Sequence, residues 1–236
     1  MNHYLYAQIH GYDYKYYQAQ HMSGYYDTWI RPHILASLLH DYDFVITLDA
    51  DVTATHMEVP FEWLFNRWNI TPRTSISMPW DVEEREPETG EVLSQDSKGL
   101  RVYNAGFVIV RNLPLTFELL QEWGNCPNET RYEGCAHWKE TWSHEQRAFS
   151  EYIRYDFNPQ GDNIVPIPCD DAMSWPGATK DYPGRIISDC NGNFFRHHTL
   201  TKEKPKDEFQ NSVMQLVAQT LQREVKLEKE NIWTKE

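Results

Sequence analysis

The sequence has no long apolar run, no signal-peptide pattern and no excess of basic residues. No hydrophobic segment approaches the roughly 18 residues that a membrane-spanning helix needs, and the N-terminus lacks the successive basic, apolar and small-residue regions of a signal peptide. The net charge of −13 excludes a broad cationic face, so we expect no nucleic-acid partner and no anionic lipid surface. Internal repeats and low-complexity tracts are also missing.

The composition is that of an ordinary globular protein. The chain has 236 residues, of which 40% are hydrophobic, and it is rich in tyrosine and tryptophan. This length supports one α/β domain with a sizeable core and disfavours two independent domains. A phosphate-bearing ligand would have to be held by a metal and a few local cations, because the overall charge is negative.

Cysteines are few, and they bracket two short loops: Cys126 and Cys135, Cys169 and Cys190. Pairing 126–135 and 169–190 would close both loops, although four cysteines allow three connectivities. Asn69 and Asn128 each begin an Asn-x-Thr sequon, and Pro72 follows the first. Disulfides and N-glycans predict a lumenal or secreted protein. Free cysteines and chance sequons are the alternative.

The most informative stretch is residues 44–51, where an apolar, β-branched run ends in Asp49, Ala50 and Asp51. It predicts a buried strand with two carboxylates at its C-terminal tip, on one side because side chains alternate along a strand. In an open α/β sheet that edge binds ligands. Two like charges so close are costly unless a cation lies beside them, which indicates a metal site. A turn with two solvated aspartates is the alternative.

Periodicity predicts the other elements in coarse outline. They are the end of a helix at residues 2–9, a short strand at 10–17, a helix with the stripe Leu35, Leu38, Leu39 and Tyr42, an exposed excursion at 81–99 with a possible hairpin at Thr89 and Gly90, a buried strand at 101–110 and a helix at 207–230. The helix that contains Leu35 would link two strands in one β-α-β crossover.

Four blocks of sequence resemble a known family. They are residues 2–12 with Tyr-Ala-x-x-His-Gly-Tyr, 29–51 ending in Leu-Asp-Ala-Asp, 104–112 with Asn-Ala-Gly-Phe and Arg-Asn, and Glu145 with Gln146. Their order resembles the retaining GT-A glycosyltransferases of the galactosyl/mannosyl/xylosyltransferase family 34, and more weakly the glycogenin-like family. The resemblance implies an α/β fold with a Rossmann-like mixed sheet flanked by helices.

Asn104, Ala105 and Gly106 form the second candidate site. Glycine admits close backbone approach, and asparagine offers a donor and an acceptor, which suits sugar hydroxyls held against a sheet edge. A bulge in a central strand is the alternative. Because the chain also has the Asp-x-Asp pattern, we expect these three residues to bind the donor sugar.

Glu145 and Gln146 form the third candidate site. The resemblance places them beneath the anomeric carbon of the donor, where a carboxylate or an amide stabilises positive charge that develops on the sugar ring. Ser143 and Gln146 also have the spacing of a helix capping box, so the alternative is that Gln146 serves only the helix start.

The C-terminal third resembles the family through His198, Lys204 and Pro205. In the resembled families a histidine completes the metal site, and a lysine six residues later meets the diphosphate; Thr201 stands here where those families have glycine. The resemblance therefore implies Asp49, Asp51 and His198 as ligands. Such a set suits Mn²⁺ better than Mg²⁺, which prefers oxygen alone. A solvated basic turn is the alternative.

The resembled families also place a strand and a base-binding loop before the first helix, whereas Met1 here falls within that helix. We expect either a piece of a longer membrane-anchored protein or a chain without its first strand, whose nucleotide-base pocket would be incomplete. The predicted division within one GT-A-like domain is 1–110 for donor and metal, 111–206 for the acceptor side, and 207–236 as a C-terminal helix.

The prediction from the sequence is thus a metal-dependent retaining glycosyltransferase of the Golgi lumen or secretory pathway. It would move a hexose or pentose from a UDP- or GDP-sugar to a glycan acceptor. Two alternatives stay open. One is a haloacid-dehalogenase-like phosphatase with Asp49 as nucleophile and Asp51 as acid/base, and with Asp170 and Asp171 as further metal ligands. The other is a non-catalytic sugar-binding subunit.

Overall fold

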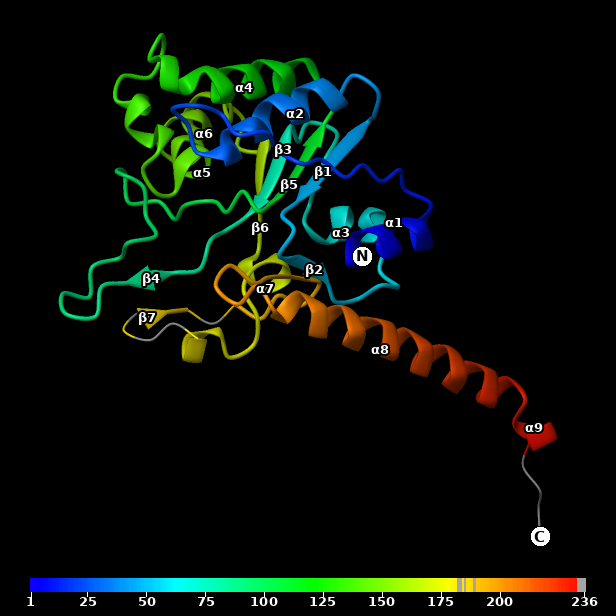
Figure 1. Ribbon diagram of the computed structural model, residues 1–236. Coiled ribbons are helices and arrows are strands. Elements are labelled where there is room, and N and C mark those ends of the chain that lie inside the picture. The colour runs from blue at the N-terminus through cyan, green and yellow to red at the C-terminus, as the bar shows by residue number, and fades with distance from the viewer. Residues whose placement is uncertain (182–183, 185, 189, 233–236) are drawn as a thin grey trace.

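A four-stranded mixed sheet forms the centre of the protein (Figure 1). The computed structural model describes residues 1–181, 184, 186–188 and 190–232. The strands lie in the order β1 (Phe44–Leu48), β5 (Phe107–Arg111), β3 (Ile76–Pro79) and β6 (Ile164–Ile167). β5 is antiparallel to both neighbours, while β3 and β6 are parallel. The predicted mixed α/β sheet is confirmed, and no strand precedes β1 among the described residues.

One edge of this sheet collects the candidate residues. Since β1, β3 and β6 run in one direction, their C-terminal ends meet at the same edge, where β5 begins. Asp49 and Asp51 follow β1, Asp81 lies two residues after β3, and the segment 104–106 leads into β5. The topology therefore brings together segments that are far apart in the sequence.

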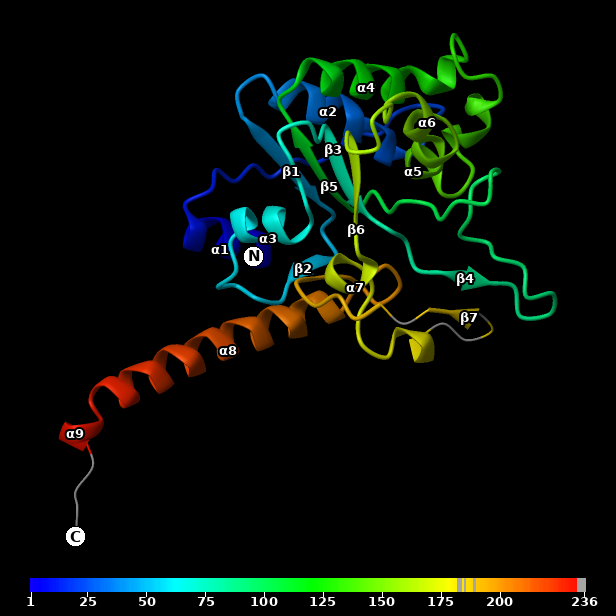
Figure 2. The same ribbon diagram turned by 180° about the vertical axis from the view of Figure 1, so that it is seen from behind.

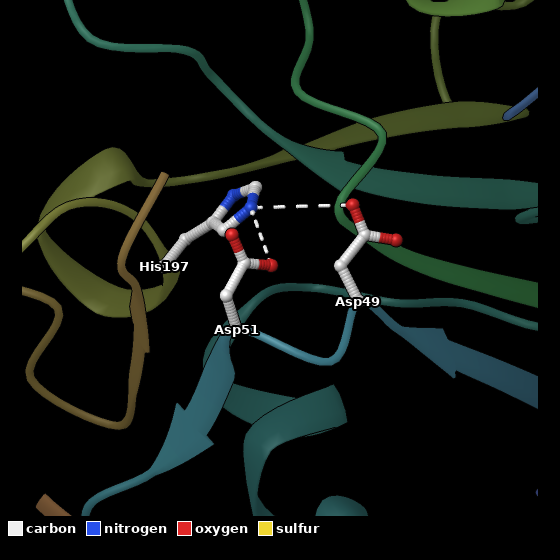
Figure 3. A group of neighbouring side chains, drawn as sticks. All are labelled: Asp49, Asp51 and His197. Atoms are coloured by element: carbon white, nitrogen blue, oxygen red, sulfur yellow. Dashed lines mark ion pairs between the residues drawn. The ribbon is translucent and has the colours of Figure 1, made fainter. Parts of the chain in front are cut away.

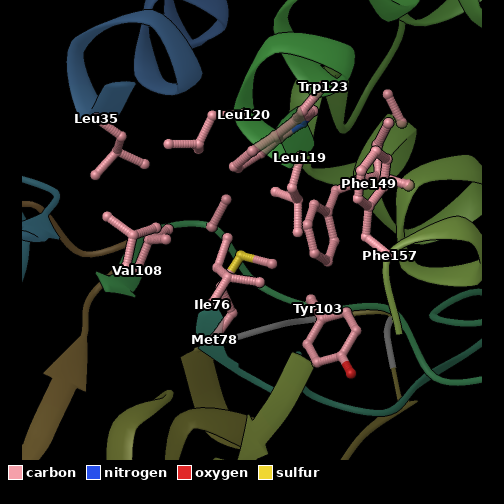
Figure 4. Packing of buried hydrophobic residues seen from close by; sticks show 14 of the residues in the cluster. Leu35, Ile76, Met78, Tyr103, Val108, Leu119, Leu120, Trp123, Phe149 and Phe157 are labelled. Atoms are coloured by element: carbon pink, nitrogen blue, oxygen red, sulfur yellow. The ribbon is translucent and has the colours of Figure 1, made fainter. Parts of the chain in front are cut away.

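Helices α2 (Ile30–Leu38) and α4 (Pro114–Asn125) cover one face of the sheet (Figures 1 and 4). Leu35, Leu119 and Trp123 are fully buried there against Val108 and Ile76. Side chains alternate along β5, so Val108 and Val110 face this cluster while Phe107 and Ile109 face the other side. The predicted stripe of Leu35 and Leu39 is confirmed as core.

The opposite face packs on α1 (Asn2–His10), α3 (Phe61–Arg67) and a small antiparallel pair, β2 (Val52–Ala54) with β8 (Phe195–His197). Tyr6, Phe61 and Phe195 meet Phe107 in a second buried cluster rich in aromatic rings. This packing fixes β8 beside the end of β1. The remaining elements are β4 (Glu84–Arg85), β7 (Ile186–Ile187), α5 (His144–Ala148), a π-helical turn (Phe149–Ile153), α6 (Arg154–Asp156), α7 (Cys169–Ala172), α8 (Lys204–Leu227), α9 (Lys229–Ile232) and 3-10 helices at Asp27–Trp29, Cys126–Asn128, Cys135–Lys139 and Ala178–Asp181.

The strand expected at residues 10–17 is wrong, and the one expected at 101–110 is confirmed only in part. Residues 12–22 carry no strand, and Tyr16 and Tyr17 are exposed, because this segment pairs with no strand of the sheet. The β-α-β crossover is therefore absent from the described chain. The strand expected at 101–110 is regular only from Phe107, since Asn104 and Gly106 interrupt it and leave isolated bridges at Arg101 and Tyr103.

The C-terminal helix is confirmed as α8, which extends away from the body of the protein (Figure 2). Along α8, Phe209 and Leu216 pack on the core, whereas Val217 and Leu221 are exposed. The excursion at 81–99 is also confirmed, with a tight turn at Gly90 and a bridge between Arg85 and Val92. Among the described residues, no helix has the length and apolarity needed to cross a membrane.

Both expected disulfides are present, Cys126–Cys135 and Cys169–Cys190, with Cα–Cα distances of 5.7 and 5.5 Å. Their loops span 9 and 21 residues. By the loop-entropy relation, closing these loops raises the free energy of the unfolded chain by about 2.5 and about 3.3 kcal/mol, which stabilises the fold.

We predict that replacing Cys169 and Cys190 together by serine lowers the free energy of unfolding more than replacing Cys126 and Cys135. The reason is the longer loop that the first pair closes. Urea denaturation of the two double variants measures the order. Peptide mapping without reductant that finds four free thiols would contradict the pairing.

Candidate functional site

Asp49, Asp51 and His197 converge at the carboxyl end of β1 (Figure 3). The Asp49 N–H donates to the Gly106 carbonyl at 2.8 Å, and His197 pairs with Val52 in the β2–β8 ladder. His197 Nε2 lies 3.4 Å from Asp51 Oδ1 and 4.0 Å from Asp49 Oδ2. One ligand atom from each residue lies within 4.8 Å of the others, a group that could hold a metal ion.

Two residues of the Asn-Ala-Gly segment fix the His197 ring. Asn104 Oδ1 lies 3.1 Å from His197 Nδ1 and also accepts the Gly106 N–H at 2.9 Å. A Cβ added to Gly106 would lie 2.2 Å from His197 Cε1, so only glycine leaves room for the imidazole. With Nδ1 directed to Asn104, Nε2 faces the two aspartates, an orientation typical of a supported metal-binding histidine.

We predict that Gly106→Ala displaces the His197 ring and weakens Mn²⁺ binding by about 10- to 100-fold, the usual effect of losing a supporting contact behind a ligand. Titration calorimetry with Mn²⁺ measures it. Gly124→Ala is the matched control, because its added methyl would also meet a histidine ring, His33, which is exposed and free to turn into solvent. A folded Gly106→Ala protein with unchanged Mn²⁺ affinity would contradict this role.

Asp51 also has a cationic neighbour, since Lys202 Nζ forms an ion pair with its Oδ2. Burial raises the pKa of Asp51, but the interactions with His197 and Lys202 outweigh it and hold the pKa well below its ordinary value. The carboxylate is therefore charged at neutral pH. Ala50, Asp51, Lys202 and Pro205 line a hollow of about 280 Å³ beside the cluster.

Glu145 is buried and held by two residues that precede β1. Arg31 bridges it to the aspartate pair, donating to Glu145 Oε1 at 2.9 Å and to Asp49 Oδ1 at 2.5 Å. Thr28 donates to Glu145 Oε2. Burial raises the pKa of Glu145, while Arg31 and Thr28 oppose that shift. The predicted catalytic carboxylate is thus connected to the predicted metal ligand through one guanidinium.

Gln146 is tied to the loop before β5. Its Oε1 accepts the Ala105 N–H at 2.9 Å, and its Nε2 donates to Asp81 Oδ2 at 2.9 Å. Asp81 Oδ1 also accepts from Asn104, and burial raises the Asp81 pKa. Ser143 makes no side-chain cap, so the capping-box interpretation of Gln146 is wrong. The second and third candidate sites therefore form one hydrogen-bonded network.

The side chains of His198 and Lys204 lie away from the aspartate pair. His198 is fully buried with its ring 5.1 Å from that of Trp175, and neither ring nitrogen has a hydrogen-bond partner among the described residues. Burial, followed by Lys204 and Arg196, lowers the His198 pKa to about 4. Lys204 Nζ pairs with Asp181. The residues that lie next to Asp51 are His197 and Lys202, whereas the sequence resemblance predicted His198 and Lys204 at this site.

Sequence reasoning missed four residues of the network, Arg31, Asp81, His197 and Lys202. For His197 a signal exists in the strand period, since Phe195 is an obvious core residue and His197, two positions later, shares its side. For Arg31 and Asp81 no local pattern identifies the contact, because their partners lie 114 and 65 residues away along the chain.

No protein-family model and no curated protein matches the chain. Among solved structures, a glycosyltransferase involved in the glycosylation of the major capsid of PBCV-1 is similar with a TM-score of 0.57 and 15% identity, over 89% of this chain and 88% of that one. Mouse xyloside xylosyltransferase 1 in its apo form gives a TM-score of 0.44 and 14% identity, over 83% and 70% of the two chains. At such low identity the first similarity establishes the fold alone. The chain thus has the mixed α/β fold of the PBCV-1 glycosyltransferase.

Proposed function

We propose that the protein is a metal-dependent retaining glycosyltransferase that moves a hexose or pentose from a UDP- or GDP-sugar to a glycan. The observation that carries the proposal is the meeting of Asp49, Asp51 and His197 at the carboxyl edge of a sheet whose fold is shared with a glycosyltransferase. In α/β sheets that edge is where ligands bind.

The donor set fits Mn²⁺. Two carboxylates and an imidazole combine oxygen with nitrogen, which suits Mn²⁺ better than Mg²⁺. The His197 nitrogen lies 3.4 and 4.0 Å from the carboxylate oxygens, spacings compatible with ligands around one ion at about 2.2 Å each. A bound Mn²⁺ would neutralise charge on the leaving diphosphate. We assign Asp49, Asp51 and His197 as its ligands.

We propose that Lys202 and Lys204 bind the diphosphate together with the metal ion. Lys202 already contacts Asp51 beside the hollow that Ala50 lines, and ligand binding would exchange this partner for a phosphate oxygen. The predicted role of Lys204 requires its ion pair with Asp181 to open. In a reaction whose leaving group gathers negative charge, such cations act where that charge develops.

Glu145 would act on the sugar. Arg31 and Thr28 hold its carboxylate in one position, so it needs no reorganisation as positive charge grows on the ring. Gln146 holds the segment 104–106 by a hydrogen bond to the Ala105 N–H. We propose that this segment binds the donor sugar. Retention at the anomeric carbon follows from the family resemblance.

The phosphatase alternative finds no support in this arrangement. Asp171, its proposed further ligand, is bound by Arg67 and Trp68 Nε1, and Asp170 accepts from Asn191. The other alternative, a non-catalytic sugar-binding subunit, differs from the proposed enzyme in that it would bind the sugar without turnover. The two disulfides favour an oxidising compartment, and we propose the Golgi lumen or secretory pathway.

A screen of UDP- and GDP-sugars for hydrolysis and transfer tests the proposal. We expect turnover of at least one donor with Mn²⁺ and none with chelator. Binding of UDP or GDP without turnover of any donor would leave only the non-catalytic alternative. Formation of a phosphoaspartate from a phosphate ester would favour the phosphatase.

A further inference from the structure

We propose that Trp142 binds a neutral sugar ring of the glycan acceptor on its exposed indole face. Its ring stands nearly perpendicular to the stacked rings of Tyr26 and His144, and we call this aromatic surface of Trp142 and Tyr26 the platform. The inference rests on the proposed function, because it names the acceptor side of the same site. It concerns residues outside the metal cluster and outside the hydrogen-bonded network described above.

Both side chains are exposed although both are large and aromatic. Trp142 is 76% accessible and Tyr26 is 49% accessible. An exposed aromatic patch of this kind often marks a binding surface, since the folded protein gains nothing from leaving it in water. The apolar face of an indole or phenol ring suits the C–H face of a sugar, while the sugar hydroxyls stay in water.

The platform is rigid because the two segments that carry it are joined. The Tyr26 ring stacks on the His144 ring with centroids 3.6 Å apart and an interplanar angle of 1°. The Trp142 ring makes a T-shaped contact with the same imidazole, with centroids 5.5 Å apart and an interplanar angle of 82°. The Tyr26 N–H also donates to the Lys139 carbonyl at 2.8 Å. Side chains fixed in this way lose little entropy when a ligand binds.

The platform is continuous with the proposed catalytic carboxylate. His144, which both rings contact, immediately precedes Glu145, and Thr28, two residues after Tyr26, donates to the Glu145 carboxylate. The segment that leads into α2 accordingly lies beside α5 (Figures 1 and 2). The platform is therefore joined to the buried Glu145 through His144 and Thr28, which places it on the surface over the segments that hold this carboxylate.

The charges nearby favour a neutral ligand. Asp27, Lys139 and Glu140 lie in the same two segments, so the nearby charges are mixed, with two carboxylates to one ammonium group. The His144 ring, which burial keeps neutral by lowering its pKa, adds none. A phosphate or an acidic sugar would find no cluster of cations here, which separates this surface from the diphosphate side at Lys202.

The test measures binding of cellotetraose, maltotetraose and mannotetraose to the full chain in the absence of nucleotide. Tryptophan fluorescence and saturation-transfer NMR detect the binding. We expect at least one of them to bind, and Trp142→Ala to weaken it by about 10-fold, the loss of one stacking contact. Trp63→Ala is the matched control, since Trp63 is 49% exposed on α3 and lies outside the platform. Trp142→Ala should bind UDP or GDP with Mn²⁺ as the unmodified protein does.

Each outcome separates this inference from the proposed function. If UDP or GDP binds with Mn²⁺ but no oligosaccharide does, or if Trp63→Ala weakens binding as much as Trp142→Ala, the platform is wrong while the proposed function stands. If an oligosaccharide binds through Trp142 but neither nucleotide binds, the platform is a sugar site and the proposed transferase function fails.

Discussion

Replacing Asp51 by asparagine is expected to abolish Mn²⁺-dependent binding of UDP or GDP and to reduce turnover by on the order of 10²-fold or more. The substitution keeps the shape of the side chain and removes its charge. Asp51 is the carboxylate nearest to His197 Nε2, and its ordinary acidity is increased by that histidine and by Lys202. Losing it removes one anionic ligand and leaves Lys202 without its carboxylate partner.

Calorimetry with UDP and with GDP, in Mn²⁺ and in chelator, measures the effect. Asp41→Asn is the control, because Asp41 is an exposed carboxylate three residues before β1 and outside the cluster. Thermal denaturation establishes that the Asp51 variant is folded. Equal nucleotide affinity in Mn²⁺, in chelator and in Asp51→Asn would show that the aspartate pair is not the metal site.

The parts of the site that could be predicted are those encoded by neighbouring residues. The run that ends in Asp49 and Asp51 predicts the strand β1 with two carboxylates after its C-terminal end, because side-chain alternation acts within a few residues. The predicted burial of this strand is wrong, since β1 lies at the edge of the sheet and only Val45 in it is buried. The disulfide pairs follow likewise from short loops. In contrast, residues 10–17 alternate like a strand but find no partner, and strand pairing is a property of the whole fold.

The connections within the site could not be predicted for the same reason. Arg31 reaches Asp49 and Glu145, and Gln146 reaches Ala105 and Asp81, only after the sheet and its helices have assembled. The family resemblance pointed to Glu145 and Gln146 as candidates without indicating that hydrogen bonds hold both side chains. The sequence analysis explained Gly106 by close approach of a sugar, whereas the structure gives a steric reason in the ring of His197.

The choice between His197 and His198 is the sharpest conflict between motif and structure. The spacing to Lys204 favours His198, while the geometry favours His197. We expect His197→Ala to lower metal-dependent turnover by on the order of 10²-fold or more, as removal of an electrostatic contact at the developing charge does. Its loss would also be visible as weaker Mn²⁺ binding in the absence of nucleotide.

His198→Phe is the matched comparison. It replaces a fully buried imidazole, whose nitrogens have no partner in the described chain, by an apolar ring of similar shape. Since a buried polar group without a hydrogen bond is costly, we expect the melting temperature to stay or rise and turnover to change by no more than a few-fold. If the folded His198→Phe protein instead loses turnover and Mn²⁺ binding while His197→Ala retains both, the motif spacing identifies the ligand. The segment after β8 must then shift by one residue when the metal binds, which would carry the orphaned imidazole to the aspartates.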